Sequence, residues 1–153
     1  MTTAPILQAL LLADRVYKDV TGKHIICGVF NKLQFQKGGA LPKTIEVNGE
    51  ERQVVPGGTQ AGSPYVYLCM TDLRGKTEFV LRYVNLDQDN VLMEIRFAVE
   101  CNDPLQTVEL TLPMPALPHM AGVHALELLC GDQPMGSYRV LVEEKGETDG
   151  NRS

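Results

Sequence analysis

The chain has 153 residues, of which 44% are hydrophobic and 22% are charged. This length and composition predict one globular domain with a sizeable core, over residues 1–144, and exclude a chain that is disordered throughout. The formal net charge is −5, because 19 acidic residues outnumber 14 basic ones. A nucleic-acid partner is therefore not expected. The sequence contains no apolar run of about 18 residues, so no membrane span is expected.

An apolar run of eight residues, ILQALLLA (6–13), follows a start that contains no Lys or Arg. A secretory signal has a positively charged segment before its apolar stretch, so we interpret this run as part of the mature protein. The four cysteines form no CxxC pair and lie inside apolar runs; they are Cys27, Cys69, Cys101 and Cys130. We expect reduced thiols that pack as small hydrophobes in a cytoplasmic protein.

Apolar and polar residues alternate along most of the chain, which predicts strands with one buried face. In the first third, a hairpin of 6–17 with 23–35 is expected, although Leu7, Leu10 and Leu11 also have helical spacing. Turns rich in Asp, Asn, Gly and Pro separate the later strands. These later strands are predicted at 64–72, 76–86, 91–101, 105–113, 122–130 and 135–144.

Two long connections interrupt this pattern. The first, 36–63, is rich in Gly and Pro, and its Asn48-Gly49 pair predicts a small ribbon of 44–47 with 53–55. The second, 113–122, contains three prolines, which exclude a regular internal strand or helix. The polar residues 145–153 are expected to be a disordered tail. The pattern as a whole predicts an all-β fold, an antiparallel β-sandwich of about seven to nine strands, Ig-like or C2-like, with a long insertion after the first hairpin.

Both ends of the chain carry a recognisable pattern. The segment 11–33 contains Asp14, Val16, Asp19, Gly22-Lys23, Gly28 and Phe30, and the end contains Gly122, Leu126, Leu128, Gly136 and Val140. The first pattern resembles the opening of a family of small bacterial proteins without an assigned activity, and the second resembles a closing Ig-like hairpin. The resemblance implies an all-β fold and supplies no catalytic residues.

In a sandwich of successive antiparallel strands, the connections alternate between the two ends. Counting along the predicted strands places 36–63, 87–90 and 113–122 together, at what we call the long-loop end. The turns at the opposite end each contain one aspartate: Asp19, Asp72, Asp103 and Asp132. The two longest loops are therefore expected to share an end, as binding loops on a rigid scaffold often do.

These placements predict a non-catalytic binding or scaffold module that contacts a protein partner of unknown identity. Arg52 and His119 are the candidate partner-binding residues at the long-loop end. Tyr65 and Tyr67 are the candidates on an apolar sheet face, because their strand is apolar on both sides. Either the protein's own insertion or the second subunit of a homodimer could cover that face.

The alternative is a small-ligand or metal-binding β-sandwich that uses Asp87, Asp89 and His119, in which the two aspartates form the chain's one DxD motif within a turn. Calcium at the opposite end is disfavoured, because each of those turns supplies a single aspartate that turn chemistry already explains. His124 is expected to pack at the start of a strand and His24 to be exposed. No nucleophile, phosphate-binding or zinc-protease motif is present, so we expect neither an enzyme nor a cofactor.

Overall fold

The computed structural model describes residues 4–36, 43–47, 50–54, 64–114 and 120–145, which form strands and turns without a helix. Within these residues, no helix is present that could cross a membrane. The strands, in chain order, are β1 (Ile6–Lys18), β2 (His24–Val29), β3 (Lys32–Gln36), β4 (Lys43–Val47), β5 (Glu50–Val54), β6 (Tyr65–Thr71), β7 (Gly75–Asn85), β8 (Asn90–Cys101), β9 (Val108–Pro113), β10 (Gly122–Cys130) and β11 (Gln133–Lys145).

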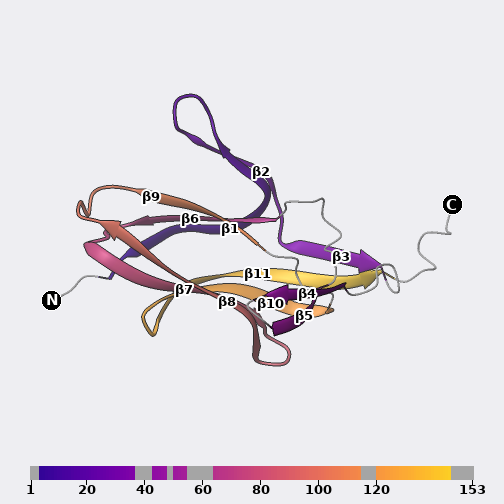
Figure 1. Ribbon diagram of the computed structural model, residues 1–153. Coiled ribbons are helices and arrows are strands. Elements are labelled where there is room, and N and C mark those ends of the chain that lie inside the picture. The colour runs from indigo at the N-terminus through magenta and orange to yellow at the C-terminus, as the bar shows by residue number, and fades with distance from the viewer. Residues whose placement is uncertain (1–3, 37–42, 48–49, 55–63, 115–119, 146–153) are drawn as a thin grey trace.

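Nine of these strands form two sheets that face each other (Figure 1). The first sheet has the order β2-β1-β6-β9 and the second has the order β3-β11-β10-β7-β8. The predicted all-β fold and the number of strands are confirmed. One pair departs from the expected antiparallel arrangement, because β3 runs parallel to β11. The ribbon predicted inside the insertion is present as β4 paired with β5.

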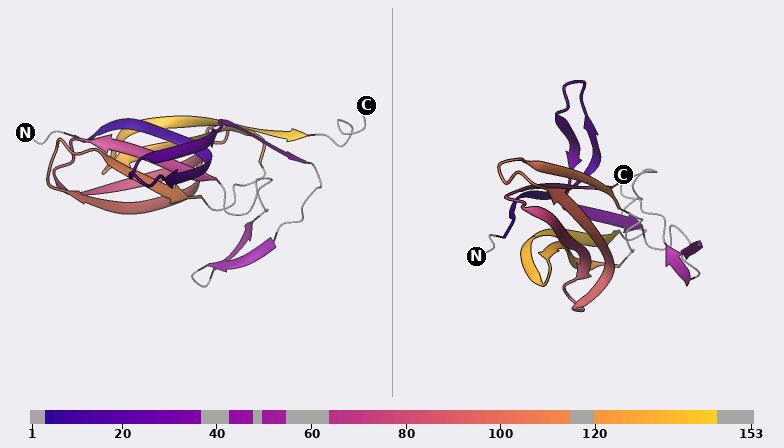
Figure 2. Two further views of the ribbon diagram at one scale, coloured as in Figure 1. Left: turned by 90° about the horizontal axis from the view of Figure 1, so that it is seen from above. Right: turned by 60° about the vertical axis from the view of Figure 1, so that its left-hand side comes forward.

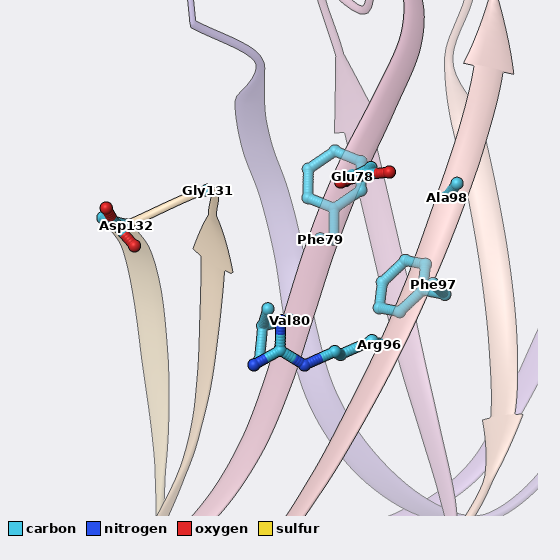
Figure 3. A pocket seen from close by; sticks show the side chains of 8 residues that line it. All are labelled: Glu78, Phe79, Val80, Arg96, Phe97, Ala98, Gly131 and Asp132. Carbon is cyan, nitrogen blue, oxygen red and sulfur yellow. The ribbon is translucent and has the colours of Figure 1, made fainter.

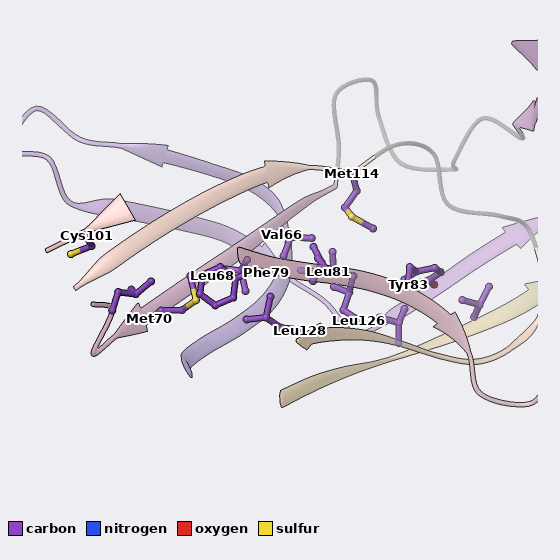
Figure 4. Packing of buried hydrophobic residues seen from close by; sticks show 14 residues of the cluster. Val66, Leu68, Met70, Phe79, Leu81, Tyr83, Cys101, Met114, Leu126 and Leu128 are labelled. Carbon is purple, nitrogen blue, oxygen red and sulfur yellow. The ribbon is translucent and has the colours of Figure 1, made fainter. Parts of the chain in front are cut away.

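The core lies between the two sheets and follows from the alternation of side chains along each strand. In β6, Val66, Leu68 and Met70 point inward and have no exposed surface. They meet Phe79 and Leu81 of β7 across the core, as Figure 4 shows. Each such fully buried side chain contributes about 1.5–3 kcal/mol to folding. The remaining buried members of this cluster are Leu12, Leu73, Tyr83, Cys101, Met114, Leu126, Leu128, Val140 and Val142.

The strand predicted over 23–35 is wrong in one respect, because it is two strands in two different sheets. The chain crosses from β2 of the first sheet to β3 of the second at Phe30 and Asn31. The N–H of Phe30 donates to the carbonyl of Leu12 at 3.1 Å, and its carbonyl accepts from the Tyr138 hydroxyl at 2.6 Å. The N–H of Leu141 donates to the carbonyl of Asn31 at 2.8 Å. These hydrogen bonds fix the crossing between the sheets, because they bind Phe30 and Asn31 to β1 and β11.

The hairpin of β1 with β2 extends beyond the first sheet as an arm, which we define as residues 14–29 (Figure 1). Only the first half of β1 pairs with β6, ending at the pair Ala13–Tyr65, and the rest of β1 pairs with β2 alone. At the base of the arm, Gly28 has a φ of 72°. A Cβ at this position would collide with the carboxylate of Asp14. Glycine is therefore required where the arm leaves the sheet.

The crossing at Phe30, together with the arm before it, also changes which of the predicted turns lie at each end of the sandwich. Asp19 lies in the turn at the tip of the arm, so its expected grouping with the other three aspartate turns is wrong (Figure 2). The other three turns do share an end. The N–H of Asp72 donates to the carbonyl of Pro104, and Asp72 and Gln133 line one shallow hollow there. The strand expected from residue 105 starts at Val108, because Asp103 accepts bonds from the N–H groups of the two residues after Pro104.

Replacing Gly28 with Ala should destabilise the protein by about 1 kcal/mol more than replacing Gly22 with Ala. Both glycines have positive φ, so both variants acquire backbone strain. A Cβ at Gly22 meets nothing within 4 Å, whereas at Gly28 it meets Asp14. Urea unfolding of the two variants measures the difference, and equal losses would contradict the close contact with Asp14.

Candidate functional site

The long-loop end is a hydrogen-bonded platform that joins the strands flanking both long connections. The carbonyl of Pro64, just after the insertion, accepts a bond from the N–H of Met114 at 2.9 Å. The N–H of Leu86 donates to the carbonyl of Val123 at 2.8 Å, and the N–H of Val123 donates to Asp87 Oδ2 at 2.9 Å. These bonds join the described ends of the three connections predicted at this end, Pro64 with Met114 and Asp87 with Val123.

Asn85 organises the tight turn between β7 and β8 from a buried position, with only 1% of its surface exposed. Its Oδ1 accepts bonds from the N–H groups of Asp87 at 3.0 Å and Gln88 at 3.2 Å. Its Nδ2 lies 3.1 Å from the sulfur of Met120, just before β10. Sequence reasoning did not single out Asn85. Its position, just before the Asp-Gln-Asp turn and at the end of an alternating strand, is the signal that could have identified it.

Beneath this platform, Tyr83 and His124 form a polar pair inside the core. Both have no exposed surface, and the Tyr83 hydroxyl lies 2.7 Å from Nδ1 of His124. Nε2 of His124 has no hydrogen-bond partner among the described residues. Burial lowers the pKa of His124, although the charge of Asp87 acts in the opposite direction, and burial raises the pKa of Tyr83. Both groups are therefore neutral at pH 7, and the prediction that His124 is a packing residue is confirmed.

The residues predicted to hold a metal do not form a ligand set within the described part of the chain. Asp87 uses one carboxylate oxygen to bind the N–H of Val123. Asp89 is exposed in the same turn with a φ of 52°, a conformation that Asp tolerates well. His119 lies outside the described residues. No three His, Cys, Asp or Glu side chains of the described ranges gather closely enough to hold an ion.

The two tyrosines among the candidate partner-binding residues differ in how accessible they are, and Arg52 is placed by its strand. Arg52 is in β5, in register with Ile45 of β4. Tyr65 is partly buried at the start of β6, whereas Tyr67 is only 7% exposed. A partner could reach Tyr67 only if the group that covers it moved away.

His24, near the tip of the arm, is the group that covers Tyr67. The two ring centroids are 5.6 Å apart, and Nδ1 of His24 lies 2.9 Å from Oε2 of Glu109 on β9. The Tyr67 hydroxyl also donates to this carboxylate, and the pKa of Tyr67 is raised by burial and by that hydrogen bond. The expectation that His24 is exposed is wrong, since its side chain is only 9% exposed. No sequence signal predicts this contact, because it depends on the arm lying over the first sheet.

An open groove of about 400 Å³ lies on the opposite side of the molecule, near the end with the aspartate turns (Figure 3). Val80 and Arg96 lie side by side in it, and Glu78 and Asp132 contribute carboxylates. Arg96 is already paired with Glu94 at 2.8 Å and its side chain is 76% exposed. The groove therefore has the character of an ordinary charged sheet surface.

All four cysteines are free, as the sequence predicted. Burial raises the pKa values of Cys69 and Cys130, which makes both thiols poor nucleophiles at neutral pH. Cys101 is buried, and Cys27 is exposed on the arm.

Comparison with known protein families gives one match. A family model described as a family of unknown function, DUF6941, matches residues 8–143. The chain belongs to this family. The match begins in β1 and ends in β11, so both sheets and the arm are within the family's span. A comparison with curated proteins found no matching protein.

The stability of the protein should fall on acidification between about pH 7 and pH 5 because of His124. Its pKa is lower in the folded protein than the ordinary value of 6.5, so below that pH the unfolded chain binds more protons than the native state. One such group gives a slope of at most about 1.4 kcal/mol per pH unit.

Chemical unfolding across this pH range measures the slope. The paired variant Tyr83→Phe/His124→Leu removes both polar partners and should give a flatter profile. Tyr83→Phe alone should be the least stable of the set, because it leaves Nδ1 of His124 buried without a partner, at a cost of about 1–3 kcal/mol. An unchanged slope in the double variant would contradict the assignment to His124.

Substitutions in the turn at 86–89 should show that Asp87 contributes to the free energy of unfolding, whereas Asp89 contributes little. Asp87→Ala should lower the free energy of unfolding by about 1.5–3 kcal/mol, because the N–H of Val123 loses a charged acceptor. Asp89→Asn should change it by less than about 0.5 kcal/mol, because Asn also tolerates positive φ. Melting each variant with and without Ca²⁺ or Zn²⁺ also tests the metal hypothesis, which requires a rise in the wild type that Asp89→Asn reduces.

Proposed function

We propose that the protein is a non-catalytic binding or scaffold module whose protein partner docks at the long-loop end. The observation that carries this proposal is the hydrogen-bonded platform at that end. The bonds Pro64–Met114 and Asp87–Val123 fix strands of both sheets at the points where the long connections leave them. Long loops on a rigid scaffold are the usual way in which such folds present a binding surface.

We also propose that the sandwich is of the Ig-like type. In support of this, the hairpins β7–β8 and β10–β11 lie in one sheet while β6 and β9 lie next to each other in the other. The chain therefore crosses between the sheets after β6, β8 and β9, which is the Greek-key order of Ig-like domains. Loops at one end of such sandwiches are common binding surfaces, so this type agrees with the proposed function.

The chemistry of the described side chains supports a non-catalytic role. The polar pair Tyr83–His124 is sealed in the core, where no substrate could reach it. His24 and Glu109 hold the arm against Tyr67, and the neighbouring thiol of Cys69 has a raised pKa. Four free cysteines also support a reducing, cytoplasmic location, which we include in the proposal.

The test is affinity capture from native lysate, comparing the full chain with a variant in which a short turn replaces residues 38–62. We expect the full chain to retain a specific partner and the loop variant to lose it while it still melts cooperatively. Leu105→Asp is the matched control, because Leu105 is 89% exposed in a turn at the opposite end. This control should still capture the partner. Loss of the partner with Leu105→Asp, or retention by the loop variant, would contradict docking at the long-loop end.

A further inference from the structure

The arm is a two-stranded ribbon whose edges are both open. β2 pairs with β1 and with no other strand of the described sheets. β6 begins at Tyr65, opposite Ala13, so the part of β1 beyond Ala13 has β2 as its sole partner. Figures 1 and 2 show the arm projecting from the first sheet, and His24 of the arm contacts Tyr67 and Glu109 of that sheet. Two-stranded ribbons are marginally stable in water and gain from further strands.

Among the edge strands of the two large sheets, β2 is the one without protective residues. Edge strands normally carry charged side chains or proline, which discourage pairing with another chain. β3 starts with Lys32, β8 contains Glu94, Arg96 and Glu100, and β9 contains Glu109 and ends at Pro113. The sequence of β2 is HIICGV, which contains no Lys, Arg, Asp, Glu or Pro.

The residues that β2 places on the outward face of the arm are apolar as well, whereas β1 contributes Tyr17 and Arg15 to that face. Opposite residues in an antiparallel pair share a face, so Tyr17 and Ile25 lie together, as do Arg15 and Cys27. Because His24 and its opposite residue face the first sheet, these two pairs face away from it. Tyr17 is 51% exposed and Cys27 is exposed. A further strand beside β2 would extend this apolar face.

The distribution of charge favours a second copy of this chain as the added strand. β2 has no formal charge, so antiparallel pairing with itself brings no like charges into opposition. The arm carries three basic residues and two acidic ones, whereas the rest of the chain carries eleven basic and seventeen acidic residues. In an antiparallel pair, the tip of each arm lies beside the base of the other. Lys18 and Lys23 near the tip would therefore approach the acidic body of the second copy.

We propose that β2 pairs antiparallel with β2 of a second copy about a two-fold axis, so that two arms form one four-stranded sheet. Such an interface is isologous and closed, and it leaves neither β2 edge free. The contact is small, so the dimer should form in a concentration-dependent way. The proposal is independent of the partner at the long-loop end, because it uses a different surface.

Sedimentation velocity of the full chain over a roughly hundredfold range of concentration tests the proposal. The wild type should shift from monomer to dimer. The variant Cys27→Lys/Val29→Lys places a charge at two exposed positions of β2 and should raise the dissociation constant at least about tenfold. Val91→Lys is the matched control, since Val91 is 49% exposed on the edge strand β8, and it should dimerise as the wild type does.

A second readout uses the exposed thiol of Cys27. A short bis-maleimide should cross-link the wild-type dimer, and Cys27→Ser should abolish the cross-link. A monomeric wild type at the highest concentration would overturn the proposal, and so would dimerisation of the β2 double variant with wild-type affinity. Loss of the dimer with intact capture of a loop-end partner would separate this result from a failure of the proposed function.

Discussion

The crossing of the chain from one sheet to the other at Phe30 and Asn31 is the constraint on which the rest of the structure depends. The backbone of Phe30 binds Leu12 of the first sheet, and its carbonyl accepts the Tyr138 hydroxyl of the second. The next residue, Asn31, binds the N–H of Leu141. Two adjacent residues thus join both sheets, and they also decide where the chain changes from one sheet to the other. Because the change occurs here, β3 must run parallel to β11, and the preceding hairpin is left outside the sandwich as an arm.

Buried polar groups organise the long-loop end. Burying an amide or an imidazole costs free energy unless its hydrogen-bonding atoms are satisfied. Asn85 recovers that cost by bonding two backbone amides of its turn and by contacting Met120. His124 recovers only part of it, because Tyr83 satisfies Nδ1 while Nε2 finds no partner in the described part of the chain. The turns at the long-loop end are therefore well fixed, whereas the buried pair Tyr83–His124 beneath them lowers the free energy of unfolding.

Most of the sheet structure could be predicted from the sequence, because alternation is a local property of each strand. The strand expected at 122–130 is found at Gly122–Cys130, and the one expected at 91–101 is found at Asn90–Cys101. The shared end of the three connections also follows from local turns, since these fix the order in which the strands reverse. Contacts between residues far apart in the sequence could not be predicted from the alternation and the turns. The break at Phe30 depends on hydrogen bonds to residues more than a hundred positions away, and the burial of His24 depends on the arm covering Tyr67. The stretch 23–35 contains Gly28, Asn31 and Lys32 in its middle, but these residues alone do not show that the chain changes sheet there.

The position of the arm determines how the uncharged edge strand β2 can pair with another chain. An uncharged edge within a sheet would invite pairing with any extended chain that meets it, and the other three edges of the two large sheets carry charges that oppose this. Gly28 lies at the base of the arm, where its positive φ and its close contact with Asp14 leave no room for a side chain, and the edge of β2 that does not pair with β1 is open along the arm. A second copy of β2 suits this edge, because it is also uncharged and brings no like charges into opposition.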